Sequence, residues 1–158
     1  MNNYNIREIE KSEYPLLEEF LYEAIFQRDE NKLLPRDVIN QPSLKIYIED
    51  FGKKDDLCLV AETNGKVIGA VWTRIIDAFG SVDCSTPEFA ISLYKEYRGH
   101  GIGSDLMKKM LKALKEMGYL KTSLAVQKDN YALKMYQNVG FEIVRENSEE
   151  YIMVCDLK

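Results

Sequence analysis

The stretch Ile91–Leu111, ISLYKEYRGHGIGSDLMKKML, decides the fold, because it joins a strand-like run directly to a strongly helical one. Gly99, Gly101 and Gly103 alternate at this junction. A glycine inside a helix or strand costs about 0.5–1 kcal/mol relative to alanine. Three glycines at one junction therefore indicate a requirement other than local stability.

The helix after the junction offers a reason. The first turn of a helix leaves main-chain N–H groups unpaired and carries a partial positive charge, so it binds anions. Missing side chains at alternate positions let a phosphate approach those N–H groups closely, and Arg98 can add a charge-assisted hydrogen bond. The pattern predicts a diphosphate-binding loop, with a plain tight turn as the alternative.

Two familiar nucleotide-binding loops do not fit this stretch. A dinucleotide-binding turn needs a glycine three residues after Gly101, where this chain has Ser104. A P-loop needs a closing Gly-Lys-Ser/Thr, which is also missing here. The loop is therefore expected to hold a different diphosphate.

Composition and charge narrow the class of protein. A chain of 158 residues, 46% of them apolar, is typical of one globular domain. A net charge of −5 argues against a nucleic-acid partner. The sequence has no apolar run of about 18 residues, which argues against a membrane span. Cys58, Cys84 and Cys155 lie far apart, which predicts free thiols in a reducing cytoplasm.

Hydrophobic periodicity predicts alternating strands and helices. Asn64-Gly65 between two apolar runs predicts a hairpin. Ser12 is expected to cap the first helix, and Pro42 to interrupt the second helical stretch. The expected strands are 4–9, 57–63, 66–76, 88–94, 120–127, 141–146 and 150–157, and the expected helical segments are 12–28, 35–51, 104–117 and 129–139.

The sequence resembles the GNAT superfamily of acyl-CoA-dependent N-acyltransferases. Residues 98–103, RGHGIG, match its [RQ]-x-x-G-x-[GA] pyrophosphate loop. Downstream, NYALKMYQNVGF (130–141) is similar to the family's Asn-Ala-Tyr-Gly-Phe signature through Asn130, Ala132, Tyr136 and Gly140-Phe141. Asn130 stands closer to Tyr136 than in many members, so it either binds coenzyme A or caps the helix.

The resemblance implies a fold and indicates which part of the chain binds each substrate. The expected class is α/β (α+β): one domain over 1–158 with a mixed, mostly antiparallel sheet of six to seven strands and about four helices. The sheet should splay at the strand before the pyrophosphate loop. Helical segments over 12–56 would form the acceptor side, and residues 88–141 the acetyl-CoA-binding core.

The resemblance also assigns cofactor contacts. Ser92, Leu93 and Tyr94 would pair with the pantetheine arm of acetyl-CoA, mainly through main-chain groups. No metal site is expected. The pyrophosphate would lie on Arg98, Gly99, His100, Gly101, Ile102, Gly103 and Ser104.

The implied reaction is direct attack of an amine on the thioester, without a covalent enzyme intermediate. An alkylamine, with a pKa near 10.4, is almost wholly protonated at neutral pH, so a carboxylate is expected to take its proton, directly or through water. Glu88 stands within one residue of the glutamate that many relatives carry; the alternatives are Glu62, bulk water, or a merely solvated Glu88. Tyr136 matches the family's usual proton donor to the leaving thiolate, with a core role as its alternative. His100, the only histidine, belongs to the phosphate loop.

These assignments predict an N-acetyltransferase that moves an acetyl group from acetyl-CoA to a primary amine. The expected acceptor is a small molecule, with a protein N-terminus or a lysine side chain as alternatives. A domain that binds acyl-CoA without turnover is the second class of function. Acidic residues in the first helical segment weakly indicate a cationic acceptor, or simply a solvated face. No nucleic-acid or membrane partner is expected, and a homodimer is compatible with the sequence.

Overall fold

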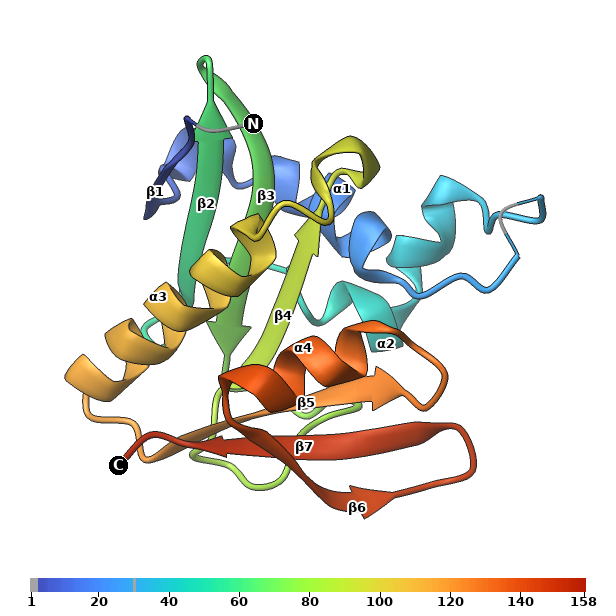
Figure 1. Cartoon of the computed structure of the whole chain (residues 1–158), viewed down its shortest axis with the longest axis vertical. Coiled ribbons are helices and arrows are strands. Elements are labelled where there is room, and N and C mark those ends of the chain that lie inside the picture. Colours follow the sequence, from blue (N-terminus) through green and yellow to red (C-terminus); the bar gives the residue numbers. More distant parts are fainter. Residues whose placement is uncertain (1–2, 30) are drawn as a thin grey trace.

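One sheet organises the chain (Figure 1). The computed structural model describes residues 3–29 and 31–158, and within them the sheet has seven strands in the order β1-β2-β3-β4-β5-β7-β6. The strands are β1 (Asn5–Glu8), β2 (Leu57–Thr63), β3 (Lys66–Arg74), β4 (Glu88–Leu93), β5 (Lys121–Gln127), β6 (Phe141–Glu146) and β7 (Glu150–Asp156).

The sheet opens between β4 and β5. Neighbouring strands are antiparallel except β4 and β5, which run parallel and share a single register pair, Glu88 with Ser123. Beyond that pair the two strands diverge, as Figure 1 shows, while β4 stays paired with β3 as far as Leu93. The predicted splay before the glycine-rich loop is confirmed.

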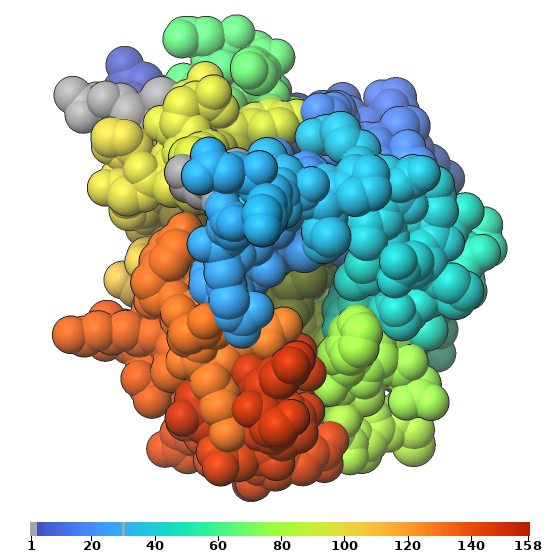
Figure 2. Space-filling model, turned by 90° about the vertical axis from the view of Figure 1, so that its right-hand side faces the viewer, coloured from blue at the N-terminus to red at the C-terminus, as the bar shows by residue number. Residues whose placement is uncertain are grey.

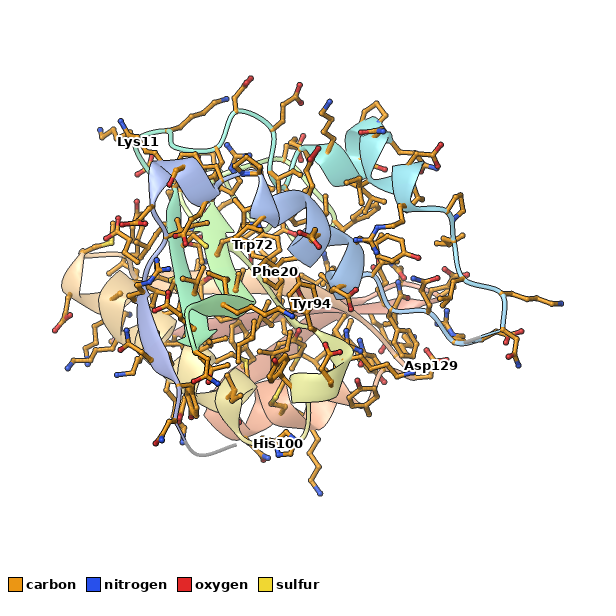
Figure 3. All side chains as sticks on the ribbon, turned by 90° about the horizontal axis from the view of Figure 1, so that it is seen from above. Lys11, Phe20, Trp72, Tyr94, His100 and Asp129 are labelled. Carbon is orange, nitrogen blue, oxygen red and sulfur yellow. The ribbon has the colours of Figure 1, made fainter. Side chains whose placement is uncertain are left out.

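Helices cover both faces of the sheet. Helices α3 and α4 lie on one face, and α1 lies on the other (Figure 1). Phe20 of α1 and Trp72 of β3 are fully buried between α1 and the sheet, next to Tyr94 (Figure 3). This arrangement confirms the predicted mixed fold. The helices are α1 (Leu16–Ala24), α2 (Pro42–Lys45), α3 (Ile102–Glu116) and α4 (Ala132–Val139), with short 3-10 segments η1 (Lys11–Glu13), η2 (Arg36–Asn40) and η3 (Lys95–Tyr97).

The first helical segment differs from the prediction. Ser12 does not cap α1, because it lies inside η1 and α1 begins only after Pro15. The η1 turn is closed instead by the Glu13 carboxylate, which accepts a hydrogen bond from Glu10 N at 2.9 Å. Proline has no N–H group, which suits the start of a helix. The helix also ends before residue 28, since Ile25 is already extended, with ψ 119°.

The second helical stretch is interrupted where the sequence indicated. Segment η2 ends at Asn40, Gln41 is extended, and α2 starts at Pro42. A residue before proline is pushed out of the helical region, so the Gln41-Pro42 pair separates the two short helices. Elsewhere, α3 begins two residues earlier than predicted, α4 three residues later, and β3 ends at Arg74.

A buried ion pair fastens the segment after α2 to the sheet. Arg74 and Asp56 lie 3.0 Å apart, and both side chains are 3% exposed. Arg74 also donates to the carbonyl of Glu49 at 2.8 Å, and Trp72 Nε1 donates to the carbonyl of Tyr47 at 3.0 Å. These bonds hold Tyr47 beside β4, where the candidate site lies.

The cysteines agree with the prediction of free thiols. Cys58 and Cys155 are buried and Cys84 is exposed, and none of them forms a disulfide. Over residues 3–29 and 31–158, no helix is both long and apolar enough to cross a membrane.

Candidate active site

The loop between β4 and α3 forms a cradle suited to an anion. Gly101 is the N-cap residue of α3 with φ 85°, and Gly99 has φ 81°. No side chain caps α3, so the N–H groups of its first turn remain available. A side chain at either glycine would meet no heavy atom within 4 Å. Packing therefore does not require glycine at these two positions. Glycine is required because the backbone is left-handed there and because the approach to the N–H groups stays open without a side chain.

The strand before the cradle turns main-chain groups toward the gap in the sheet. Tyr94 N donates to Ile68 O of β3 at 3.0 Å, and in an antiparallel pair every second residue is bonded in this way. Ser92 is therefore also bonded to β3, whereas the N–H and C=O groups of Ile91 and Leu93 face the gap. The main-chain groups of Ser92 and Tyr94 are therefore engaged by β3, and the groups that face the gap belong to Ile91 and to Leu93, one of the three predicted residues; the pantetheine contact itself stays a prediction.

The side chains of Ser92 and Tyr94 contact α1, on the face of the sheet that α1 covers. Ser92 Oγ donates to the carbonyl of Phe20 at 2.6 Å. The Tyr94 ring lies 5.0 Å from that of Phe20, and its hydroxyl donates to Glu19 at 3.0 Å. Both residues anchor α1 to β4, which fixes the wall of the cleft.

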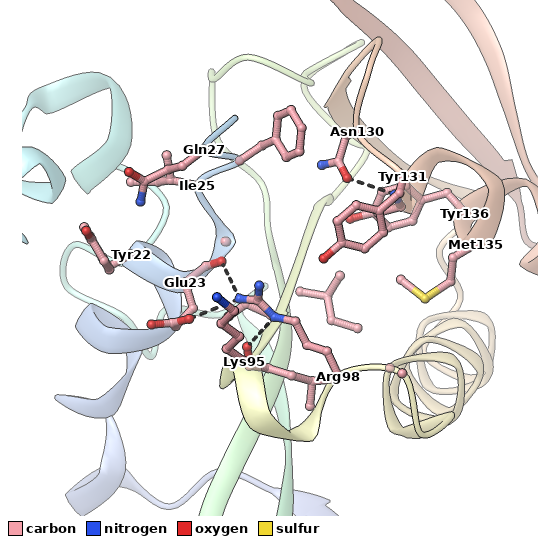
Figure 4. Close-up of a pocket in the computed structure, with 18 of the residues that line it drawn as sticks. Tyr22, Glu23, Ile25, Gln27, Lys95, Arg98, Asn130, Tyr131, Met135 and Tyr136 are labelled. Carbon is pink, nitrogen blue, oxygen red and sulfur yellow. Dashed lines mark hydrogen bonds and ion pairs between the residues drawn. The ribbon is translucent and has the colours of Figure 1, made fainter. Parts of the chain in front are cut away.

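Arg98 lies at the cleft, but its guanidinium is already engaged (Figure 4). Its Nε donates to Leu93 O at 3.0 Å, and Nη2 donates to Glu23 Oε1 at 3.1 Å. The Arg98 and Glu23 side chains are 36% and 20% exposed, so the ion pair remains in contact with water. The predicted phosphate contact of Arg98 thus competes with a bond to the end of α1.

Asn130 lies just before α4, whose N-cap residue is Tyr131. Its Oδ1 accepts a hydrogen bond from Ala132 N, the first residue of α4, at 2.8 Å. This bond agrees with the capping alternative, and the amide nitrogen points toward the cleft in Figure 4. Binding of coenzyme A by Asn130 remains a prediction.

Tyr136 on α4 stands between two cavities. Its ring packs against Phe141, with centroids 5.9 Å apart, while the residue lines both cavities. Burial raises the pKa of Tyr136 to about 12, with a smaller contribution from Tyr131. In the described part of the chain its hydroxyl forms no hydrogen bond, so the group remains free to act as a donor.

Glu88 lies at the start of β4 and is only 2% exposed, so the alternative of a solvated acid is wrong. Its carboxylate accepts hydrogen bonds from Tyr47 Oη, from Gly80 N at 3.0 Å and from Ser81 Oγ at 3.0 Å. Burial raises the pKa of Glu88 above its ordinary value, although these three donors oppose the shift. The result is a buried, oriented carboxylate with raised proton affinity.

Glu62, the other candidate base, lies elsewhere. It sits on β2, where its Oε2 accepts a hydrogen bond from Arg7 Nη2 at 2.9 Å. Strand β3 separates β2 from β4, and Glu62 lines neither cavity. The fold therefore excludes Glu62 as a base for chemistry at this cleft.

The two cavities meet beside β4. One has a volume of about 650 Å³ and contains the cradle, and the other, of about 340 Å³, contains Glu88. Figure 2 shows the surface hollowed here, with β4 at the bottom of a gap between the segment that follows α1, the α2 region and the β3–β4 connection. Arg28 of the segment after α1 pairs with Asp129 before α4, with Nη2 and Oδ1 2.6 Å apart. Residues lining both cavities are Ala24, Ile25, Phe26, Ile91, Asn130 and Tyr136.

Comparison with known proteins agrees with this geometry. Residues 4–141 match the model of the acetyltransferase (GNAT) family. The chain is a GNAT-family protein. It is also 33% identical over 106 residues to an acetyltransferase of Pectobacterium atrosepticum, covering 66% of this chain and 70% of that relative.

Solved structures share the GNAT fold along nearly the whole chain. The PaiA N-acetyltransferase of Thermoplasma acidophilum, in complex with coenzyme A, has a TM-score of 0.71 at 21% identity, covering 98% of this chain and 99% of the other. A putative acetyltransferase of Salmonella typhimurium, solved with acetyl-CoA, has a TM-score of 0.73 at 18% identity, covering 99% and 95%. These neighbours establish the fold, and their ligands belong to those proteins.

Sequence reasoning missed the residues that hold Glu88 in this GNAT site. Tyr47 follows α2, and Gly80 and Ser81 lie in the long connection between β3 and β4. Gly80 cannot be replaced without strain, because a Cβ there would stand 2.5 Å from Ala125 N of β5, but only the fold reveals this contact. The turn-rich composition around Gly80 indicated a loop, but not that the loop packs against the sheet.

Proposed function

We propose that the protein is an N-acetyltransferase that transfers an acetyl group from acetyl-CoA to a primary amine by direct attack. The observation that carries the proposal is the position of Tyr136 and Glu88. Tyr136 lines both cavities, and Glu88 lines the one that does not contain the cradle. Donor and acceptor substrates would thus enter from opposite sides and meet beside Ile91.

The cradle and the strand edge fit acetyl-CoA as a substrate. The uncapped first turn of α3 offers N–H donors to the pyrophosphate. The outward N–H and C=O groups of Ile91 and the N–H group of Leu93 can pair with amide groups of the pantetheine arm, as in the addition of a strand, whereas Leu93 O already accepts a hydrogen bond from Arg98 Nε. Arg98 would exchange its bond to Glu23 for one to phosphate.

The chemistry balances without a covalent enzyme intermediate. The amine nitrogen forms a bond to the acetyl carbon, the carbon–sulfur bond breaks, and coenzyme A leaves as the thiolate. The ammonium first gives one proton to Glu88 and becomes the free amine that attacks, and the second nitrogen proton, lost as the tetrahedral intermediate collapses, passes through water to the thiolate or to solvent. Ile91 lies three residues beyond Glu88, about 10 Å along the strand, so this transfer would run through intervening water.

Tyr136 would act on the leaving sulfur. A thiol has an ordinary pKa near 8.5, whereas the pKa of Tyr136 is raised to about 12. The phenol therefore holds its proton more tightly than the thiolate does. A hydrogen bond that strengthens as charge develops on sulfur is the contribution expected, rather than a completed proton transfer.

We infer a small-molecule acceptor and a cytoplasmic enzyme. The acceptor cavity is about 340 Å³, within the ordinary range for small ligands. The Arg28–Asp129 ion pair links the segments on either side of the hollow and narrows access for a folded protein. Free thiols, including the exposed Cys84, suit a reducing compartment.

A thiol-release assay tests the proposal. The protein is incubated with acetyl-CoA and a mixed library of primary amines, and free coenzyme A and acetylated products are measured. We expect amine-dependent thiol release and a product heavier by one acetyl group. Clear binding of coenzyme A without release from any amine would instead indicate an acyl-CoA sensor.

A further inference from the structure

Glu88 has almost no surface of its own through which to exchange a proton. The residue lines the second cavity, yet it is only 2% exposed. Tyr47 Oη and Gly80 N donate to its Oε2, and Ser81 Oγ lies 3.0 Å from its Oε1. A base must still receive a proton from the acceptor and lose it before the next turnover. The proton therefore has to pass through the groups that bond the carboxylate.

These groups differ in what they can carry. An amide N–H donates a hydrogen bond and accepts none, which leaves Gly80 as an anchor. A hydroxyl accepts and donates at the same time, so Tyr47 and Ser81 can each pass a proton on. Because the two hydroxyls contact different oxygens of Glu88, the carboxylate has two separate ports for a proton.

The two hydroxyls open in different directions. Tyr47 is half-buried and lines the second cavity, whereas Ser81 is half-buried and lines neither cavity. Ser81 Oγ has a single proton and two acceptors, Glu88 Oε1 at 3.0 Å and Ile76 O at 2.6 Å, so this proton can turn from one acceptor to another. One port of Glu88 thus faces the acceptor, and the other faces bulk water.

The charges around the two ports are negative. Burial raises the pKa of both Glu88 and Tyr47, and the charge of Glu150 adds to both shifts. A main-chain hydrogen bond from Phe79 opposes the shift at Tyr47. The other charged residue among the described residues that line the cavity is Glu149. Tyr47 therefore stays a neutral phenol, which passes a proton only by accepting one as it gives one.

We propose that Glu88 works within a proton relay, in which Tyr47 brings the proton from the acceptor cavity and Ser81 releases it to bulk water. The inference rests on the proposed acetyl transfer and adds two relay residues to it. On the cavity side, Tyr47 Oη takes a proton from the ammonium, through any bridging water, and gives its own proton to Glu88 Oε2. The ammonium becomes the free amine, Tyr47 ends unchanged, and Glu88 becomes neutral.

The exit completes the cycle. A half-turn of the Glu88 carboxyl group exchanges its two oxygens and brings the proton to Ser81, because this last torsion is broad and two-fold. Ser81 Oγ accepts that proton and gives its own to water. Glu88 is then ionised again, and one proton has passed from the ammonium to solvent. This exit stays open while acetyl-CoA and the acceptor fill the cleft.

First-turnover kinetics separate the two ports. The protein is mixed rapidly with saturating acetyl-CoA and an amine that is acetylated in the thiol-release assay, at a pH between the pKa of Glu88 and that of the amine. Tyr47→Phe should slow the first turnover by about a hundredfold, the lower limit for general acid–base catalysis. Ser81→Ala should keep the parent rate in the first turnover and slow the later ones, so product equal to the protein concentration appears in a burst.

Matched variants separate the relay from a loss of structure. Ser81→Thr keeps the hydroxyl and should show no burst. Ser85→Ala removes a hydroxyl of the same connection that bonds Asp83 rather than Glu88. Tyr14→Phe removes a hydroxyl from a tyrosine that packs against the same apolar cluster as Tyr47 but lines neither cavity. Both of these controls should behave as the parent.

Either port can fail on its own terms. A parent plateau rate in Tyr47→Phe, reached at a higher pH, would mean that Tyr47 only tunes the pKa of Glu88, and the relay would be overturned. A slower first turnover in Ser81→Ala would mean that Ser81 holds structure, and later turnovers at the parent rate would mean that the proton leaves elsewhere. Both results would overturn the exit.

A pH jump tests the exit without acetyl transfer. Tyr47→Phe, whose cavity port is closed, is saturated with coenzyme A and mixed rapidly to a pH above the pKa of Glu88. The infrared band of the protonated carboxyl group, identified by its absence in Glu88→Gln, reports the loss of the proton. Adding Ser81→Ala should slow the decay of this band, and adding Ser85→Ala should not.

The two assays distinguish this inference from the proposed function. If amines are acetylated and Ser81→Ala changes neither the burst nor the decay of the band, acetyl transfer stands and the relay fails. If no amine is acetylated while Ser81→Ala slows the decay, the relay stands and the proposed function fails.

Discussion

Glu88 keeps a carboxylate in a place almost closed to water. Burial favours its neutral form, while Tyr47, Gly80 and Ser81 donate hydrogen bonds that favour the charged form, and burial dominates. A base needs this balance, since a carboxylate with an ordinary pKa has little tendency to take a proton at neutral pH. Such tuning is set by neighbours and not by the residue type.

Replacing Glu88 by glutamine should change the pH dependence of the rate. A base acts only when ionised, so the parent rate should rise with pH through the raised pKa of Glu88. The variant should lose most activity below the pKa of the acceptor amine and partly recover above it, where solvent supplies free amine. A pH–rate profile of both proteins checks this, and profiles of identical shape would clear Glu88 of the role.

The stability of the same pair of proteins provides a control. Because the folded pKa of Glu88 is raised, its protonated form stabilises the fold at low pH, and this contribution is lost as pH rises through that pKa. The melting temperature of the parent should therefore fall with rising pH relative to that of Glu88→Gln. A constant difference across pH would show that the carboxylate does not titrate in this window.

Tyr136→Phe should lower kcat and leave the KM for acetyl-CoA little changed. The hydroxyl forms no hydrogen bond in the described chain, so its loss should cost no more than about 1 kcal/mol of stability. If it stabilises the departing thiolate, kcat should fall by about a hundredfold or less, the lower limit for general acid catalysis. Tyr131→Phe, at a 75% exposed residue of the same cleft, is the control and should retain the parent kcat. A parent-like kcat in Tyr136→Phe would reduce this residue to packing.

At the level of elements, the junction of β4 and α3 carries much of the candidate site. The strand supplies outward main-chain groups, the loop adopts left-handed turns at Gly99 and Gly101, and the helix begins without a cap. Adjacent segments of one sequence create all three features, which is why the local pattern predicted the cradle. The partner of Arg98 is different, because Glu23 comes from α1 and meets the loop only through packing.

Gly101→Val should weaken coenzyme A binding by at least about tenfold, through loss of charge-assisted hydrogen bonds. The branched side chain would stand in the approach to the α3 N–H groups and would resist φ 85°. The backbone strain alone is about 1–2 kcal/mol. Calorimetric titration of coenzyme A measures the affinity.

Gly65→Val separates strain from site effects. Gly65 lies in the β2–β3 turn with φ 78° and equally open surroundings, and it lines neither cavity. It should cost similar stability and leave coenzyme A affinity unchanged. Equal affinity in parent and Gly101→Val, with the fold intact, would remove residues 98–104 from the cofactor site.

Glu23→Gln should tighten coenzyme A binding. The mutation releases Arg98 from an ion pair that must otherwise open, and exposed pairs of this kind are worth about 0.2–1 kcal/mol, so the gain should not exceed about fivefold. Glu19→Gln removes the same charge from α1 without touching Arg98 and serves as the control. A loss of affinity in Glu23→Gln would mean that Glu23 orients Arg98 for phosphate rather than competing with it.

For the whole molecule, the order of strands and helices followed from the sequence because turns and periodicity are local. Asn64-Gly65 made the hairpin predictable, whereas Ser12 misled because a cap signal does not reveal that Pro15 starts the helix later. The candidate base was predictable as a residue, but its environment was not. Tyr47 reaches Glu88 only because the segment after α2 is fastened to β3, and no local pattern encodes that contact.

The single register pair between β4 and β5 has a consequence for amide hydrogen exchange. Amides inside a sheet normally exchange slowly because each is bonded to a neighbouring strand. The amides of Ile91 and Leu93 face the gap, so without ligand they should exchange as fast as those of a loop, while those of Ser92 and Ala90 remain protected. Acetyl-CoA should slow the exchange of Ile91 and Leu93 selectively, which mass spectrometry or NMR can follow. With acetyl-CoA bound, no fast-exchanging amides would separate the two halves of the sheet. The halves would then behave as one cooperative unit, with the substrate acting as the missing strand.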